Sequence, residues 1–170
     1  MDETIALTEK IIEEHRQILP NIQAAEQAIN DLEAVSKLES AREGLTPGRL
    51  DDQKANLKNL QDWLETIDKG LQAHFEREEN VLLIAFEKRG YKMVTSALRI
   101  LLLEHQELKN RIAKSKEDVA ELTTETFSRE VWEGKAWGMR TYLNRTLSLI
   151  EAHAKNEEEL FSKLRTELGA

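Results

Sequence analysis

The residues best suited to chemistry in this 170-residue chain are its histidines, of which there are only four. Two of them lie in closely similar stretches, "AHFEREE" at residues 73–79 and "AHAKNEE" at residues 152–158. On a helix, a residue four positions after a histidine lies about 40° around the axis from it, so an imidazole and a carboxylate share one face. Each stretch therefore offers one nitrogen ligand and one oxygen ligand for a metal ion.

The composition indicates that helices carry these residues. Charged residues make up 33% of the chain and aromatic residues 5%, with 7 Gly and 2 Pro, which is typical of long helices and not of a turn-rich β-protein. The length predicts a single domain over residues 1–170. Helix-breaking residues cluster at 43–50, at 88–92 and, more weakly, at 122–126.

These breaks predict four helices, at about residues 3–41, 47–88, 91–121 and 126–168. In the first break we expect Thr46 to be the N-cap with Pro47 at the first helical position, and in the second we expect Gly90 to be left-handed. Short connections favour antiparallel neighbours. The predicted fold is therefore all-α, an up-down-up-down antiparallel four-helix bundle.

Apolar periodicity places one histidine on the inward face of each helix. The stripe of the second helix shows the pattern: Leu57, Leu60, Leu64, Ile67, Leu71, His74, Glu78, Val81 and Ala85. Counted from the helix ends that meet at one end of such a bundle, the four imidazoles lie at a similar depth, roughly 18 to 23 Å. The sequence predicts a buried cluster of six side chains: His15, His74, Glu78, His105, His153 and Glu157.

A single histidine on an apolar stripe is more often a core residue with a hydrogen-bond partner than a metal ligand. About three-sevenths of helix positions face a core, so all four histidines would do so by chance in roughly 3% of cases. Two ionised carboxylates buried beside four imidazoles are also costly unless a cation compensates them. We therefore interpret the cluster as a metal site.

The donor set limits the metal. The chain has no cysteine, and imidazole nitrogen with carboxylate oxygen suits iron, manganese or zinc. Six ligands are too many for one four-coordinate zinc and too few to saturate two six-coordinate irons. Two metals that share both carboxylates, with two histidines on each, satisfy the count and leave positions for solvent or a diatomic ligand.

Four stretches of the sequence resemble hemerythrin-like proteins of the HHE cation-binding family: "EEHRQIL", "AHFEREENVLL", "LLEHQELKNRI" and "AHAKNEEELFSKL". The resemblance covers nearly the whole chain in the order of the family. It implies a non-heme di-iron centre that holds two iron ions, bridged by Glu78 and Glu157. By the same resemblance His15 and His74 would bind one iron, and His105 and His153 the other.

The sequence also departs from the oxygen-carrying hemerythrins. These carriers have a second histidine four residues after the histidine of the third helix, where this chain has Lys109, so one iron is expected to lack a ligand. The carriers place their last carboxylate five residues after the histidine, which would select Glu158. Helix geometry favours Glu157 instead, because a residue at i+5 lies about 140° away from the histidine. Glu104, directly before His105, is expected to turn away from the core into solvent.

Two functions are compatible with this site. We expect a protein that binds or senses oxygen, nitric oxide or iron; the alternative is a di-iron enzyme that acts on nitric oxide or peroxide, or one that supports repair of iron centres. A metal-free helical interaction module is a third hypothesis. Both metal-based functions use the same ligands, so the sequence alone does not separate a binding protein from an enzyme.

The remaining sequence features indicate the partners and the location. A net charge of -8 without a basic patch argues against nucleic acid and against an anionic membrane surface. We therefore expect a small diatomic ligand such as oxygen or nitric oxide as the partner. The first ten residues lack a basic region followed by an apolar core, and no apolar run could span a bilayer, so a cytoplasmic location is expected.

Overall fold

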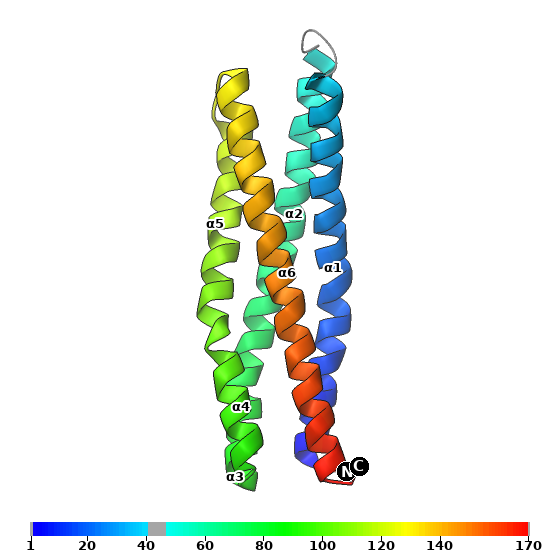
Figure 1. Cartoon of the computed structure of the whole chain (residues 1–170), viewed down its shortest axis with the longest axis vertical. Coiled ribbons are helices and arrows are strands. Elements are labelled where there is room, and N and C mark those ends of the chain that lie inside the picture. Colours follow the sequence, from blue (N-terminus) through cyan, green and yellow to red (C-terminus); the bar gives the residue numbers. More distant parts are fainter. Residues whose placement is uncertain (1, 41–46, 170) are drawn as a thin grey trace.

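Four long helical stretches run side by side along the molecule (Figure 1). The structure is a computed structural model that describes the backbone of residues 2–40 and 47–169 and the side chains of residues 2–32 and 54–169. The elements in chain order are α1 (Glu3–Ser40), α2 (Pro47–Arg77), the π-helical turn η1 (Glu78–Leu82), α3 (Leu83–Arg89), α4 (Lys92–Leu102), α5 (Glu104–Thr124) and α6 (Arg129–Glu167). The described residues contain no strand, and the prediction of an all-α helical bundle is confirmed.

The four stretches form a ring in which each helix has two neighbours. α1 packs against α2 and α6, and α5 packs against the same two helices. Figure 1 shows the chain running away from the terminal end along α1, returning along α2, and repeating this path with α4–α5 and α6. Both termini therefore lie at the same end of the bundle. None of the helices, over the residues described, combines the length and apolarity needed to cross a membrane.

Two of the predicted helix boundaries coincide with the structure. α2 begins at Pro47, and Gly90 ends α3 with a φ of 71°, a left-handed conformation in which glycine has no steric penalty. The predicted cap Thr46 lies outside the described residues.

The third connection lies later than predicted. α5 continues through Thr124, and within it the hydroxyls of Thr123 and Thr124 donate to backbone carbonyls one turn earlier, each at 2.8 Å. The α6 helix then begins at Arg129, where the Ser128 side chain accepts a hydrogen bond from a backbone N–H of the first turn. Threonine therefore marks the end of α5 but does not interrupt it.

The π-helical turn η1 changes which residues of the second stretch face the core. A π turn inserts one extra residue into the helix and so rotates everything after it. Val81, predicted to be a core residue, is 45% exposed, and Ala85 is half-buried. Leu82 and Phe86 are fully buried in their place.

A second interruption lies in the third stretch, which was predicted to be one continuous helix. Leu103 separates α4 from α5, and its N–H is 3.3 Å from the carbonyl oxygens of both Arg99 and Ile100. Leu103 is 79% exposed. The two irregular turns, η1 and the one at Leu103, both lie close to predicted metal ligands.

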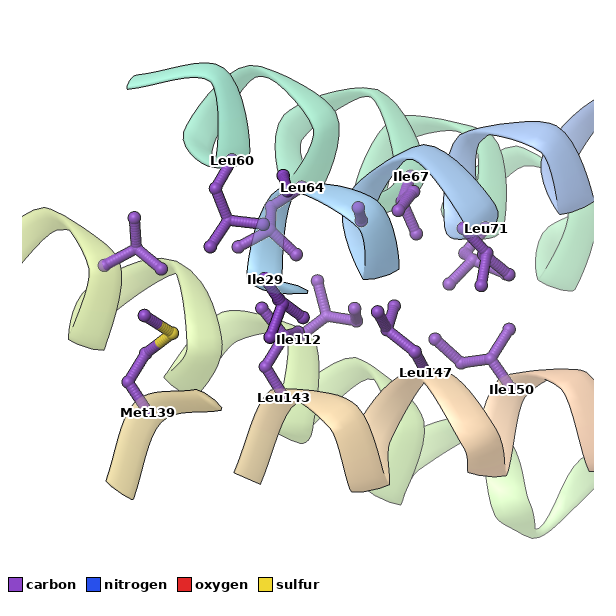
Figure 2. Close-up of a cluster of buried hydrophobic side chains, with 14 of the residues drawn as sticks. Ile29, Leu60, Leu64, Ile67, Leu71, Ile112, Met139, Leu143, Leu147 and Ile150 are labelled. Carbon is purple, nitrogen blue, oxygen red and sulfur yellow. The ribbon is translucent and has the colours of Figure 1, made fainter. Parts of the chain in front are cut away.

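Two apolar clusters fill the bundle, and the histidines lie between them. In the larger cluster, Figure 2 shows side chains of α2 facing side chains of α6: Leu60, Leu64, Ile67 and Leu71 against Leu143, Leu147 and Ile150. The smaller cluster consists of Ile11, Leu82, Phe86, Val94, Leu98, Phe161 and Leu164. Burying one such side chain contributes roughly 1.5–3 kcal/mol. The helices are therefore held in register on both sides of the histidine layer.

Candidate metal centre

The four histidines come together as two pairs in the interior of the bundle. All four are buried, with between 1% and 7% of each residue exposed. The ring centroids of His15 and His74 are 4.7 Å apart, and those of His105 and His153 are 5.0 Å apart. In each pair the two Nε2 atoms point at one another, at 3.0 Å in the first pair and 3.2 Å in the second.

Two fully buried carboxylates connect the pairs. Glu78 places Oε1 2.6 Å from Nε2 of His74 and Oε2 2.9 Å from Nε2 of His105. Glu157 places Oε2 3.6 Å from Nε2 of His15, and its Oε1 contacts Nε2 of His153. Each carboxylate therefore reaches one histidine of each pair with a different oxygen.

A second set of four carboxylates contacts the outward nitrogen of each imidazole. The distances from Nδ1 to the nearest carboxylate oxygen are 3.1 Å for His15 with Glu158, 2.8 Å for His74 with Glu14, 2.8 Å for His105 with Glu79, and 3.0 Å for His153 with Glu104. A carboxylate accepts from Nδ1–H, so the neutral imidazole keeps its lone pair on Nε2. All four lone pairs then point to the interior.

When all four imidazoles are neutral in this form, the interior of the cluster contains hydrogen-bond acceptors and lacks donors. Among the described side chains, both oxygens of Glu78 and both oxygens of Glu157 are buried without a hydrogen-bond donor. Lone pairs on two Nε2 atoms about 3 Å apart repel each other unless a proton or a cation lies close to both. Buried acceptors of this kind are costly in isolation and are the usual ligands of metal ions.

The donor atoms form two sets, each of which could hold a metal ion: His15, His74, Glu78 and Glu157 in one, and His105, His153, Glu78 and Glu157 in the other. Within each set, the ligand atoms lie within 4.8 Å of one another. Both carboxylates belong to both sets. The residues present thus fit two neighbouring cations that share two carboxylates.

The pKa values of the two buried carboxyls move in opposite directions. Burial, and next the carboxylate of Glu157, raise the pKa of Glu78 well above its ordinary value. Burial also opposes ionisation of Glu157, but contacts with Glu78, His15 and His153 outweigh burial and hold its pKa well below the ordinary value. Without a cation, this pair of carboxyls therefore favours one negative charge over two.

The pKa values of the four histidines also move in opposite directions, two downward and two upward. Burial lowers the pKa of His74, and it lowers the pKa of His105 to about 4. Burial also opposes protonation of His15 and His153, but their contacts with Glu157 and with one outer carboxylate each outweigh burial and raise both pKa values. Glu78 therefore faces two neutral imidazoles, and Glu157 faces the two that take up protons more readily.

The surroundings of the two sets differ. A cavity of about 270 Å³ reaches His15, His74 and His153, and its walls include Ile18 and Ile150. Of the second set the cavity reaches only His153, and His105 is covered by a phenylalanine that also lines the cavity.

That phenylalanine, Phe75, is fully buried and stacks on the ring of His105, with centroids 3.8 Å apart and planes at 15°. Nζ of Lys109 lies 5.9 Å from the centroid of the Phe75 ring. Lys109 thus packs on Phe75 and does not contribute to either donor set.

All six side chains that the sequence predicts to point inward are buried and lie together in the structure. Glu157 is fully buried, whereas Glu158 is 44% exposed and contacts an outward nitrogen. The outer carboxylates were missed. Glu104 is 45% exposed, as a solvated residue would be, yet it lies 3.0 Å from Nδ1 of His153. The available signals were a glutamate directly before the histidine in the first and third helices, and the second glutamate of each E-E pair.

Comparison with known proteins agrees with this geometry. A model of the hemerythrin HHE cation-binding domain matches residues 6–165. No curated protein and no solved structure gives a match. Because the matched region covers nearly all of the 170 residues and includes both donor sets, the chain belongs to the hemerythrin HHE cation-binding domain family.

Proposed function

We propose that this protein binds two iron ions and uses them to bind or sense a small diatomic ligand, oxygen or nitric oxide, or iron itself. The proposed ligands are the six inward side chains: His15, His74, Glu78, His105, His153 and Glu157. The observation that carries the proposal is the acceptor-only interior, in which two sets of donors share both carboxylates. Membership of a cation-binding family supports metal binding, and the nitrogen and oxygen donors favour iron.

The carboxylates and the histidines would have different roles in such a site. Glu78 and Glu157 would each offer one oxygen to each of the two ions. Their two negative charges would offset part of the repulsion between the cations. The histidines would hold the outer sides of the ions through Nε2. Two irons with unfilled coordination positions supply reversible binding of small molecules or electron transfer to them.

The cavity beside the site supports a small uncharged ligand. It reaches His15 and His74, and its walls include the aliphatic side chains of Ile18, Leu71 and Ile150. Aliphatic walls of this kind admit an uncharged diatomic gas. Because the cavity reaches both histidines of the first set but only His153 of the second, and Phe75 covers His105, we propose that the ligand approaches the ion held by His15 and His74.

The first test is the metal content and its spectrum. We expect close to two irons per chain, and near-ultraviolet charge-transfer bands of a bridged pair in the ferric protein. Addition of oxygen, nitric oxide or peroxide to the reduced protein without air would then separate stable binding from turnover. One zinc and no iron would contradict the proposal, and sustained turnover would favour the enzyme over the binding protein.

The second test addresses the shared carboxylates. Glu78→Ala or Glu157→Ala should abolish the signature of a coupled iron pair even where one iron remains, because each change removes an oxygen from both sets. Glu76→Ala and Glu159→Ala are matched controls, since both residues are exposed on the same helical stretches. A coupled signature that survives loss of either buried glutamate would rule out the shared arrangement.

A further inference from the structure

We propose that the outer carboxylates Glu14, Glu79, Glu104 and Glu158 are positioning residues for the metal centre. Each orients the imidazole of the neighbouring helix, and together they form a closed ring of contacts around the bundle. This inference rests on the proposed metal centre and assigns a role to four residues outside its ligand set.

The ring is closed because every contact joins adjacent helices. Glu14 of α1 contacts His74 of α2, Glu79 of η1 contacts His105 of α5, Glu104 of α5 contacts His153 of α6, and Glu158 of α6 contacts His15 of α1. Each helical stretch therefore gives one carboxylate and receives one. No imidazole of the centre lacks such a partner.

Helix geometry explains why the ring runs in one direction. On α1 and α5 the glutamate precedes its own histidine by one residue, which is about 100° backward around the axis. On the fourth stretch it follows by five residues, which is about 140° forward, and on the second it also follows by five, with a smaller forward rotation because Glu79 lies in the π-helical turn η1. Neighbouring helices are antiparallel. A backward rotation about one helix axis and a forward rotation about the next therefore have the same sense when the bundle is viewed from one end. Each glutamate thus turns away from its own histidine and toward the next helix.

The chemical consequence is the choice of tautomer. A neutral imidazole carries its proton on either nitrogen, and only the form with Nδ1–H leaves Nε2 free to bind a metal. A carboxylate at Nδ1 stabilises that form, fixes the ring orientation and makes Nε2 more basic. The ring of four glutamates would therefore prepare all four histidines before a metal binds.

The four contacts are not equivalent, which gives a ranking to test. Glu14 is 18% exposed, and its second oxygen lies 2.6 Å from Nε of Arg77. The other three carboxylates are 37% to 45% exposed and so are better screened by water. Loss of Glu14 should consequently have the largest effect, and Arg77 should act through Glu14.

Affinity for iron is the first measurement. Fe(II) is titrated without air into the full chain, in competition with a chelator of known affinity. Glu14→Gln should weaken Fe(II) binding by roughly 10–100-fold, and the corresponding changes at Glu79, Glu104 and Glu158 by smaller factors. Four exposed glutamates on the same stretches serve as matched controls that should leave affinity unchanged: Glu13→Gln, Glu76→Gln, Glu107→Gln and Glu159→Gln.

The metal-free protein gives a second measurement that does not depend on activity. Nitrogen-15 spectra of the imidazoles should report the Nδ1–H form for His74 in the wild-type chain and a mixture of forms in Glu14→Leu, with helix content retained. Arg77→Gln should weaken Fe(II) binding in the wild-type background but have no added effect in Glu14→Gln. Such non-additivity is the signature of one residue acting through another.

The outcomes separate this inference from the proposed function. Failure of the wild-type chain to bind Fe(II) would overturn both. If the wild-type chain binds Fe(II), and the four ring variants bind it as tightly as the four controls do, the positioning role of the outer carboxylates is overturned. The proposed metal centre would then remain. Weakened binding in the ring variants only, ranked with Glu14 first, is the result expected.

Discussion

Replacing Glu78 with methionine should stabilise the metal-free protein while destroying the proposed site. The Glu78 side chain is fully buried, and neither of its oxygens has a hydrogen-bond donor. The imidazoles that contact it, His74 and His105, both have lowered pKa values and so do not supply a compensating positive charge. Methionine has a similar length and adapts to irregular space.

The magnitude follows from the lost burial cost. A buried unsatisfied polar group costs about 1–3 kcal/mol, so Glu78→Met should gain a similar amount in the free energy of unfolding. For a protein of this size, each kcal/mol corresponds to about 2–4 °C, which gives an increase in Tm of about 2–12 °C. The assay is thermal unfolding of chelator-treated protein, followed by far-ultraviolet circular dichroism, with the metal content measured in parallel.

The gain should also depend on pH. Because burial raises the pKa of Glu78, the folded chain holds a proton there that the unfolded chain releases near the ordinary value of 4.5. The folded state is therefore favoured most below that pH and loses this contribution as the pH rises through the raised pKa. The difference in Tm between Glu78→Met and the wild type should widen as the pH rises.

The matched control is Glu157→Met. Glu157 contacts His15 and His153, whose pKa values are raised, so it is compensated in the metal-free protein in a way that Glu78 is not. This variant should gain less stability than Glu78→Met or lose stability. A lower Tm for metal-free Glu78→Met, or equal shifts for the two variants, would refute the reasoning that Glu78 is the uncompensated carboxyl.

Three further predictions concern the metal, the surface and the third helix. Removal of the proposed iron should lower the Tm, because bound metal adds about 2.7 kcal/mol to the free energy of unfolding where free iron exceeds its Kd 100-fold. Equal melting of metal-free and loaded protein would contradict this coupling. A hydrogen bond with Glu151 raises the pKa of Glu26 to about 7, so the stability of the wild-type chain should fall as the pH rises through 7. Glu26→Gln should lack this fall in Tm between pH 5 and 8. Parallel curves of Tm against pH for the two proteins would exclude a contribution of Glu26. Lys109→His should not stabilise reversible oxygen binding by itself, because Phe75 lies against His105, but it should do so together with Phe75→Leu. Optical spectra over cycles of oxygenation would show the difference. Reversible binding in the single variant would mean that the Phe75 side chain moves aside without being replaced.

Much of the fold was predictable from the spacing of apolar residues. The 3/4 periodicity located the helices and the inward direction of His15, His74, His105 and His153, because rotation about a single helix axis depends only on sequence distance. The same reasoning selected Glu157 as the inward glutamate and turned Glu158 outward. The prediction that Val81 is a core residue was wrong, because it assumed an α-helix throughout. The π-helical turn η1 has more residues per turn, so Val81 faces solvent.

What the sequence by itself determined is thus the contribution of each helix: one inward histidine on all four, and one inward carboxylate on two of them. What only the tertiary structure decided is how the helices meet. The pairing of His15 with His74 and the contact of Glu104 with His153 depend on the rotation and axial position of one helix against another. No spacing within a single helix encodes those quantities; they are set by the packing of the two apolar clusters on either side of the histidine layer.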